Sequence, residues 1–194
     1  MIDYLTLIME SMLILIGESA SGKTEIANYL ANTYHIVKAI TTTTRSPREK
    51  EKDGVDYYFL SKEEFLKRLK EKQFVEHILY HGNYYGTGVS EIAPNKCLIL
   101  DPLGACAFQK RNDPSIITFY LKADEETRKE RMKKRGDSPF EIESRLKEDR
   151  IHFAREKLPF LDGIIVVSKR TIPSIGDEIN QKYKMLLSER GITL

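Results

Sequence analysis

The chain has 194 residues, of which 41% are hydrophobic and 31% are charged. This length suits one ordinary globular domain with a buried core, and the balance argues against global disorder. The formal net charge of +2 is too small to indicate a nucleic-acid partner, so any attraction to phosphates must come from a local cluster of arginines and lysines.

Targeting and redox signals favour an intracellular setting. Cys97 and Cys106 have neither the spacing of a disulfide framework nor that of a metal site, which fits a reducing cytoplasm. No apolar run approaches the ~18 residues that a membrane span needs. Met1–Met9 is apolar but lacks a basic start, which argues against a signal peptide. We expect a cytoplasmic monomer or homodimer with no membrane or nucleic-acid partner.

Strands alternate with helices over most of the chain. Short apolar runs that suit strands buried on both faces occur at Met12–Ile16, Ile36–Ile40, Cys97–Leu100, Ile116–Leu121 and Ile164–Val167. A helix with one buried face follows the first run at Thr24–Asn32, and each later run precedes a stretch that could be helical. This alternation predicts an α/β fold with a mainly parallel central sheet flanked by helices.

The segment 41–87 interrupts the alternation. It contains a helical pattern at Lys62–Lys72, with Ser61 and Glu64 spaced as a capping box, between β-like pieces at Tyr57–Phe59 and Phe74–Tyr80. We interpret 41–87 as a small α+β lobe inserted into a core formed by residues 1–40 and 88–194.

A charged helical pair follows the fourth apolar run. Asp124–Arg135 and a second helix at about 140–157 flank a turn at Gly136–Pro139. Three arginines in this region could close over an anionic ligand as a lid at about 131–146, namely Arg131, Arg135 and Arg145. The alternative is a solvated, charge-laced hairpin, which is the usual meaning of such charge runs.

A phosphate-binding loop follows the first strand. The pattern G-x-x-x-x-G-K-[ST] is met by Gly17, Glu18, Ser19, Ala20, Ser21, Gly22, Lys23 and Thr24. The glycines let backbone N–H groups point at phosphate oxygens, and the following helix adds its positive end. Lys23 would contact the β- and γ-phosphates of ATP, and the Thr24 hydroxyl would ligate Mg²⁺. The alternative, a glycine-rich turn with a surface lysine, fits poorly with the strand–loop–helix context.

Asp101 has two interpretations of about equal weight. It ends the strand Cys97–Leu100, where an acidic residue of a parallel sheet could approach Mg²⁺, directly or through water. It also precedes Pro102, and Asp followed by Pro is typical of a helix N-cap and first turn.

The lobe carries the groups for a second anion. Arg45 and Arg48 lie three residues apart around a proline and could converge on one phosphate, with Tyr57 and Tyr85 as uncharged donors. The carboxylate of Glu76 could accept two hydrogen bonds from the N1–H and 2-amino edge of guanine, and adenine offers no such pair. Each residue alone has an ordinary explanation as a solvated or core side chain.

Taken together, these segments resemble the guanylate kinase family. The matching motifs are Thr43-Thr44-Arg45-x-Pro47-Arg48, Glu51, Gly54-x-Asp56-Tyr57-x-Phe59, Phe74-x-Glu76 and Gly82-Asn83-Tyr84-Tyr85-Gly86-Thr87. The resemblance implies that Arg45, Arg48, Tyr57 and Tyr85 bind the phosphate of GMP, and that Glu76, Thr41 and Thr87 hold the guanine. Glu51 and Gly86 belong to the same expected GMP site. Arg131, Arg135 and Arg145 resemble the lid arginines that contact the triphosphate.

The chain departs from the family pattern in places. By our alignment, the second Asp of the family's Asp-x-Asp-x-Gln-Gly motif, which helps recognise the guanine amino group, is Leu103. The lid turn is about one residue short, and an Asn that touches the adenine is replaced by Val167. These departures concern selectivity more than catalysis.

The resemblance implies Mg²⁺-dependent phosphoryl transfer from ATP to GMP or dGMP, giving ADP and GDP, in purine nucleotide metabolism. One alternative is a kinase of the same fold with another acceptor, such as a different nucleotide or a phosphosugar, which Leu103 motivates. A second is a non-catalytic binding module of the same family, although such modules typically have a degraded phosphate loop, and Lys23 and Thr24 are intact here.

Overall fold

A five-stranded parallel sheet forms the core of the molecule. The structure is a computed structural model, and it describes residues 11–192 except 50 and 81. The strand order is β2-β7-β1-β8-β9, and every pairing between neighbours is parallel. The bounds are β1 Met12–Ile16, β2 Val37–Lys38, β7 Lys96–Ile99, β8 Ile116–Lys122 and β9 Gly163–Val166. The predicted α/β fold with a parallel central sheet is confirmed.

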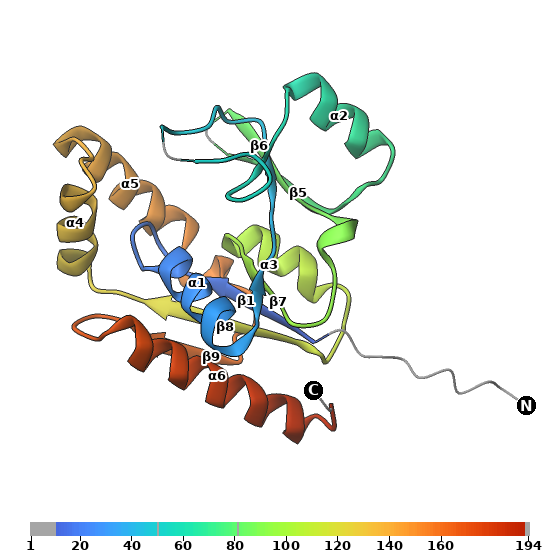
Figure 1. The fold of residues 1–194 in the computed structure, drawn as a ribbon. Helices are drawn as coiled ribbons and strands as arrows, with labels where there is room; N and C mark the ends of the chain where they lie inside the picture. The colour runs from blue at the N-terminus through green and yellow to red at the C-terminus, as the bar shows by residue number, and fades with distance from the viewer. Residues whose placement is uncertain (1–10, 50, 81, 193–194) are drawn as a thin grey trace, which may run out of the picture.

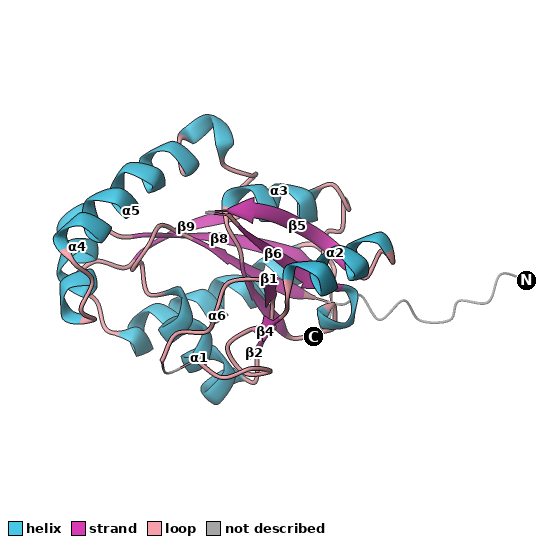
Figure 2. Cartoon of the chain, turned by 90° about the horizontal axis from the view of Figure 1, so that it is seen from above, coloured by secondary structure: helices cyan, strands magenta, loops and turns pink. Residues whose placement is uncertain are grey.

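Helices cover both faces of this sheet (Figures 1 and 2). All five residues of β1 are buried, and successive side chains alternate between two clusters because strand side chains point to opposite faces. On one face Leu13 and Leu15 pack with α1 (Lys23–Tyr34) and α6 (Ile172–Glu189). On the other face Met12, Ile14 and Ile16 pack with α3 (Pro102–Gln109).

A second, four-stranded sheet stands beside the core. Its order is β4-β3-β6-β5, and the bounds are β3 Thr42–Thr43, β4 Tyr58–Phe59, β5 Phe74–Tyr80 and β6 Asn83–Gly88. Helix α2 (Lys62–Lys70) covers it through the buried Phe65, whose ring stacks on Phe74 and Tyr84. Apart from Gly88, the last residue of β6, this sheet lies within the segment 41–87 that the sequence singled out as an insertion, and Figure 1 shows it apart from the core strands.

The charged helical pair is ordered and packed on the phosphate loop. Helices α4 (Glu125–Lys134) and α5 (Pro139–His152) lie side by side at one end of the molecule (Figures 1 and 2). Met132, Ile142 and Leu146 form a small apolar cluster between them, and Ala20 packs against it. The pair is therefore held to the core and is not a freely solvated hairpin.

Element boundaries differ from the sequence predictions in a few places. The strand predicted at Ile36–Ile40 has only the two residues of β2, and α5 ends at His152, five residues before the predicted end. A 3₁₀ turn at Arg155–Lys157 takes up the remainder. The expected absence of a signal peptide concerns Met1–Met9, which lie outside the described residues. In the part of the chain that the structure describes, no helix has the length and apolar character needed to cross a membrane.

Only one of the two hydrogen bonds of the predicted capping box forms at the start of α2. The Ser61 hydroxyl accepts a hydrogen bond from the Glu64 amide at 3.1 Å, but the Glu64 carboxylate accepts from Arg68 Nε at 3.0 Å. A partner four residues along the helix competes for the glutamate, and a charged donor makes the stronger bond. A complete capping box occurs instead at Ser138 and Glu141, at the start of α5.

Candidate active site

The phosphate loop has two residues in the left-handed backbone region, which glycine adopts without strain and alanine does not. Gly22 has φ of 96° and stands directly before α1, and Ala20 has φ of 60°. Gly17 directly follows β1, at a place where a Cβ would come within 2.7 Å of the Leu121 carbonyl oxygen and of Ser21 Oγ. Only glycine fits at such a contact, so the turn that leads β1 into α1 depends on it.

The Lys23 side chain folds back onto the start of the phosphate loop. Its ammonium donates hydrogen bonds to the carbonyl oxygens of Gly17 at 2.7 Å and Glu18 at 3.0 Å. Burial lowers the pKa of Lys23 to about 8, while the negative charges of Asp149 and Glu18 act in the opposite direction. The side chain is thus mainly charged at neutral pH and sits at the positive end of α1, as an anion site requires.

One cleft of about 860 Å³ brings the predicted donor and acceptor residues together. The cleft is lined by loop, lobe and lid residues predicted from the sequence, which are Gly17, Ser19, Ala20, Gly22, Lys23, Thr24, Thr41, Arg45, Arg48, Tyr57, Glu76, Tyr85, Gly86, Asp101, Arg131, Arg135 and Arg145. Its volume falls in the range of typical ligand pockets.

Four predicted residues lie behind the cleft wall. Ser21 is a fully buried residue of the loop, and the carbonyl oxygen of Glu18 accepts a hydrogen bond from Lys23. Thr87 is buried behind Glu76, and Glu51 lies behind Arg45. The sequence suggests ligand contacts for these four, whereas their places in the structure suit them to hold the groups that line the cleft.

Glu51 anchors the first arginine of the lobe. Its two carboxylate oxygens each accept from Arg45 Nη2 at 2.9 Å, and Oε2 also accepts from the Arg48 amide at 2.8 Å. The Arg45 guanidinium lies 5.6 Å from the ring centre of Tyr57, and that ring meets Tyr85 edge-on. The result is a cationic cluster with two phenol groups on the cleft wall, which suits a phosphate.

Glu76 is a buried carboxylate aimed into the same cleft. The β5–β6 register shifts between Phe74 and Glu76, so a bulge turns the glutamate side chain relative to a regular strand. Thr87 donates its hydroxyl to Oε1 at 2.7 Å. Burial, with the nearby charge of Asp101, raises the pKa of Glu76 to about 7.

Asp101 lines the cleft, whereas Leu103, which stands at the position of the family's guanine-recognising Asp, lies outside it. The side chain of Leu103 is 55% exposed and lies outside the cleft. Asp101 lines the cleft beside Glu76, where its charge acts on the glutamate. Gly104 makes this arrangement possible, since a Cβ there would come within 3.2 Å of Glu76 Oε2. The carboxylate beside Glu76 in this cleft is thus that of Asp101.

Asp101 also caps α3. Its carboxylate accepts a hydrogen bond from the Gly104 amide at 2.9 Å, and Pro102 opens the helix. The N-cap alternative is thus observed, and the metal alternative stays a prediction. Residues 11–192, apart from 50 and 81, contain no group of three or more His, Cys, Asp or Glu side chains placed to hold a metal ion.

A Mg²⁺ ion would find few protein ligands at this site. Thr24 lies in the first turn of α1 and lines the cleft. So small a number of protein ligands fits Mg²⁺, because this ion usually keeps several waters and binds through one or two protein oxygens plus substrate phosphates.

The lid arginines contact the loop and a shared carboxylate on the lid turn. Arg131 Nη1 donates to the Ala20 carbonyl oxygen at 3.1 Å. Arg135 pairs with Asp137, and Arg145 Nε lies 3.5 Å from the same carboxylate. Arg135, with smaller effects from Arg145 and Arg48, holds the pKa of Asp137 below its usual range. Arg135 and Arg145 of the lid line the same cleft as Arg45 and Arg48 of the lobe.

Several further cleft residues had no signal in the sequence. Lys134 and Asp149 reach the cleft from the lid helices, and Arg170 reaches it from the turn before α6. The sequence pattern does not distinguish such residues, because most charged residues on a charged helix, or before a helix, are solvated. Val167, which takes the place of the adenine-contacting Asn, is buried, and its carbonyl oxygen accepts from Arg131 Nη2 at 3.5 Å.

Comparisons with known proteins agree on one family. The family model described as guanylate kinase matches residues 9–169. The guanylate kinase of Clostridium tetani (strain Massachusetts / E88) is 32% identical over 205 residues, covering 93% of this chain and 94% of that protein. The guanylate kinase of Clostridium perfringens (strain 13 / Type A) is 36% identical over 144 residues, covering 70% and 67%.

A solved structure supports the fold. The crystal structure of guanylate kinase from Anaplasma phagocytophilum matches with a TM-score of 0.65 and 23% identity, covering 96% of this chain and 98% of that one. The family match extends from before β1 to the turn before α6 and so includes the loop, the second sheet and the lid helices. This chain belongs to the guanylate kinase family.

Proposed function

We propose that this protein transfers the γ-phosphoryl group of ATP to GMP or dGMP, giving ADP and GDP. One observation carries the proposal. A single cleft is lined both by the Lys23 loop and by a cluster of arginine and tyrosine side chains on the second sheet, with the buried Glu76 beside that cluster. Two anion sites that face one cleft suit a reaction between two phosphates.

The donor side is the loop Gly17–Thr24. Its backbone N–H groups and the start of α1 favour the phosphates of ATP, and Lys23 adds a full positive charge. Thr24 would hold Mg²⁺ together with phosphate oxygens, with Asp101 acting through water. The ion would neutralise charge on the transferred group.

The acceptor side is the lobe 41–87. Arg45, Arg48, Tyr57 and Tyr85 would hold the phosphate of GMP through charged and phenolic donors. Glu76 would accept hydrogen bonds from the guanine edge, and Thr41 and Gly86 complete the wall around the base. Thr87 would support the base site from behind, by holding the Glu76 carboxylate. Glu51 would act one step back, by fixing Arg45 and the Arg48 turn.

The chemistry requires positioning and charge compensation rather than a strong base. The attacking phosphate oxygen of GMP is already ionised, so no side chain has to remove a proton from it. Lys23, Arg131, Arg135 and Arg145 would offset the negative charge of the transferred group, and closure of the lid at 131–146 would exclude water. We propose that the enzyme works in the cytoplasm in purine nucleotide metabolism, as a monomer or homodimer.

An acceptor panel tests this function. ADP release is measured with MgATP and each of GMP, dGMP, AMP, UMP and dTMP, for the wild type and for Glu76→Gln. We expect turnover with GMP and dGMP only, and a fall of roughly 5- to 150-fold in kcat/KM for GMP in the variant, because an unpaired buried polar group costs about 1–3 kcal/mol. Comparable rates with AMP and GMP in the wild type would refute the guanine assignment.

A further inference from the structure

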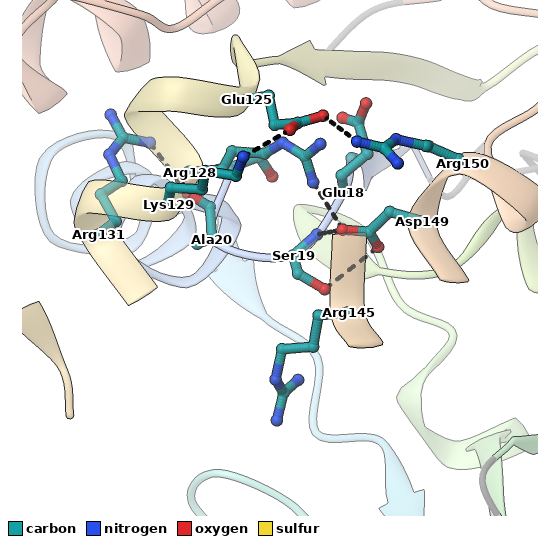
Figure 3. A network of polar contacts seen from close by, with 12 residues as sticks. Glu18, Ser19, Ala20, Glu125, Arg128, Lys129, Arg131, Arg145, Asp149 and Arg150 are labelled. Carbon is teal, nitrogen blue, oxygen red and sulfur yellow. Dashed lines mark hydrogen bonds and ion pairs between the residues drawn. The ribbon is translucent and has the colours of Figure 1, made fainter. Parts of the chain in front are cut away.

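A buried carboxylate on α5 joins three separate parts of the site. Asp149 of α5 accepts hydrogen bonds from the Ser19 amide at 3.1 Å and from Arg128 Nη1 of α4 at 2.6 Å, both through Oδ2. Its other oxygen, Oδ1, accepts from the Ser19 hydroxyl at 3.1 Å. Figure 3 shows this carboxylate between the loop and the two helices. The contact links the phosphate loop to both lid helices.

The ion pair stands about one helical turn from two of the three lid arginines, Arg131 and Arg145. Arg128 precedes Arg131 by three residues, and Asp149 follows Arg145 by four, so each pair shares a helix face. Arg131 in turn donates to the carbonyl oxygen of Ala20, the residue after Ser19. The hydrogen bonds between Asp149 and Ser19 therefore fix the distance of both arginines from the loop.

Stability is a weak explanation for this pair. Asp149 and Arg128 are only 4% and 5% exposed. The desolvation cost of two such charges is large, and apolar residues of similar size often serve a fold as well or better. A hydrogen-bonded charge pair does, however, fix direction and distance, because its charge-assisted bonds are short and strong.

We infer that Asp149 and Arg128 are positioning residues for phosphoryl transfer, which hold Arg131 and Arg145 in register with the phosphate loop through Ser19. This inference rests on the proposed function, because it assigns the two arginines to the transferred phosphate. Misplacement of a catalytic group by about 1 Å can reduce the rate by roughly 100-fold, so a loosened register is expected to lower kcat more than the affinity for GMP.

A second ion pair between the same helices provides a matched control. Arg150 of α5 and Glu125 of α4 lie 2.8 Å apart, but their side chains are 61% and 37% exposed. Figure 3 shows them on the side of the helices away from Arg145. An exposed pair contributes little to stability, and the contacts of this one are with neighbouring helix residues rather than with the loop. Glu125→Gln breaks it without touching the buried pair.

The test separates position from stability. Three variants are compared with the wild type, namely Asp149→Asn, the double variant Arg128→Met with Asp149→Leu, and Glu125→Gln. The quantities are kcat, KM for ATP and for GMP, the calorimetric Kd for MgATP, and Tm. Asp149→Asn leaves a buried guanidinium unpaired and should lower Tm, whereas the double variant removes both charges and should recover it.

We expect the double variant to keep a roughly 10- to 100-fold lower kcat at its recovered Tm, with KM for GMP within about twofold of wild type and weaker MgATP binding. Glu125→Gln should match the wild type in all of these quantities. Wild-type kcat and MgATP affinity in the double variant would overturn the inference, as would an equal loss in Glu125→Gln.

Two further arms keep the outcome decisive. If the double variant does not fold, Arg128→Lys retains the charge but loses the planar fork, and an unchanged kcat in that variant would overturn the inference. The calorimetric arm needs no acceptor. If the wild type fails to phosphorylate GMP, the proposed function fails, and MgATP binding by the variants still decides whether the pair orders the loop.

Discussion

Thr87 donates its hydroxyl to the Glu76 carboxylate at 2.7 Å, and the two residues face each other across β6 and β5. Both are buried, so the bond holds the carboxylate in a fixed direction within the cleft wall. The hydrogen bond from Thr87 favours the charged form of Glu76, whereas burial and the charge of Asp101 favour the neutral form. The second effect is larger, so the pKa of Glu76 is raised to about 7. The carboxylate therefore changes its charge within the neutral pH range.

GMP binding should weaken as the pH falls through 7. The charged carboxylate accepts both guanine donors, whereas the protonated group presents one of its oxygens as an O–H. The pKa of Glu76 is about 7, so the carboxylate is almost fully charged at pH 8 and only about one-tenth charged at pH 6. We expect a parallel rise in KM for GMP between pH 8 and pH 6. Steady-state kinetics over this range, with Glu76→Gln as the control for titration of the substrate phosphate, measure the effect.

Stability should change in the opposite sense in the absence of nucleotide. The pKa of Glu76 is raised from 4.5 to about 7 in the folded protein. Between these values the folded state holds a proton that the unfolded state has lost, so the free energy of unfolding should decrease as the pH rises from about 4.5 to about 7. Urea unfolding of wild type and Glu76→Gln checks this. The wild type should lose stability relative to the variant across that window, and parallel curves would contradict the prediction.

Removal of the Thr87 hydroxyl should move the GMP profile toward higher pH. The hydrogen bond from Thr87 lowers the pKa of Glu76, so Thr87→Val should raise that pKa further and weaken GMP binding most near neutral pH. Thr87→Ser keeps the hydroxyl and should retain the wild-type midpoint. The measurement is KM for GMP against pH, and an unshifted midpoint in Thr87→Val would show that the bond does not tune the carboxylate.

Loss of Glu51 should affect the acceptor and spare the donor. Its carboxylate fixes Arg45 and the Arg48 amide, and hydrogen bonds to charged groups contribute about 1.5–3 kcal/mol. We expect Glu51→Ala to raise KM for GMP roughly 10-fold or more and to leave KM for ATP near wild type. Glu64→Ala, which breaks the exposed pair with Arg68 on α2, is the control within the same lobe. Equal changes in both KM values would argue for a general loss of structure.

Replacement of Lys23 by alanine should reduce kcat by roughly 100- to 1,000-fold, the usual effect of removing one group aimed at developing charge. The ammonium stands at the loop and contacts the carbonyl oxygens of Gly17 and Glu18. Lys182→Ala, which removes an exposed lysine paired with Glu178 on α6, is the matched control. An ADP-release assay compares the two, and near-normal kcat in Lys23→Ala would refute the proposed donor site.

The sequence alone determined the local features. The buried strand Met12–Ile16, the loop that follows it, and the helix after the loop are short-range patterns in which each residue type has a direct physical cause. The motif in the lobe likewise pointed to Arg45, Glu76 and Tyr85 as acceptor-site residues. Such patterns can be read from the sequence because strand burial, glycine turns and helix starts depend mainly on neighbouring residues.

Only the tertiary structure decided how distant groups meet. It placed Leu103 outside the cleft and Asp101 beside Glu76, and it placed Glu51 behind Arg45. The contact of Asp149 with Ser19 spans 130 residues, and no periodicity along the chain encodes it. A charged residue on a charged helix looks the same whether it is solvated or buried. Its partner is set by the packing of α4 and α5 on the loop.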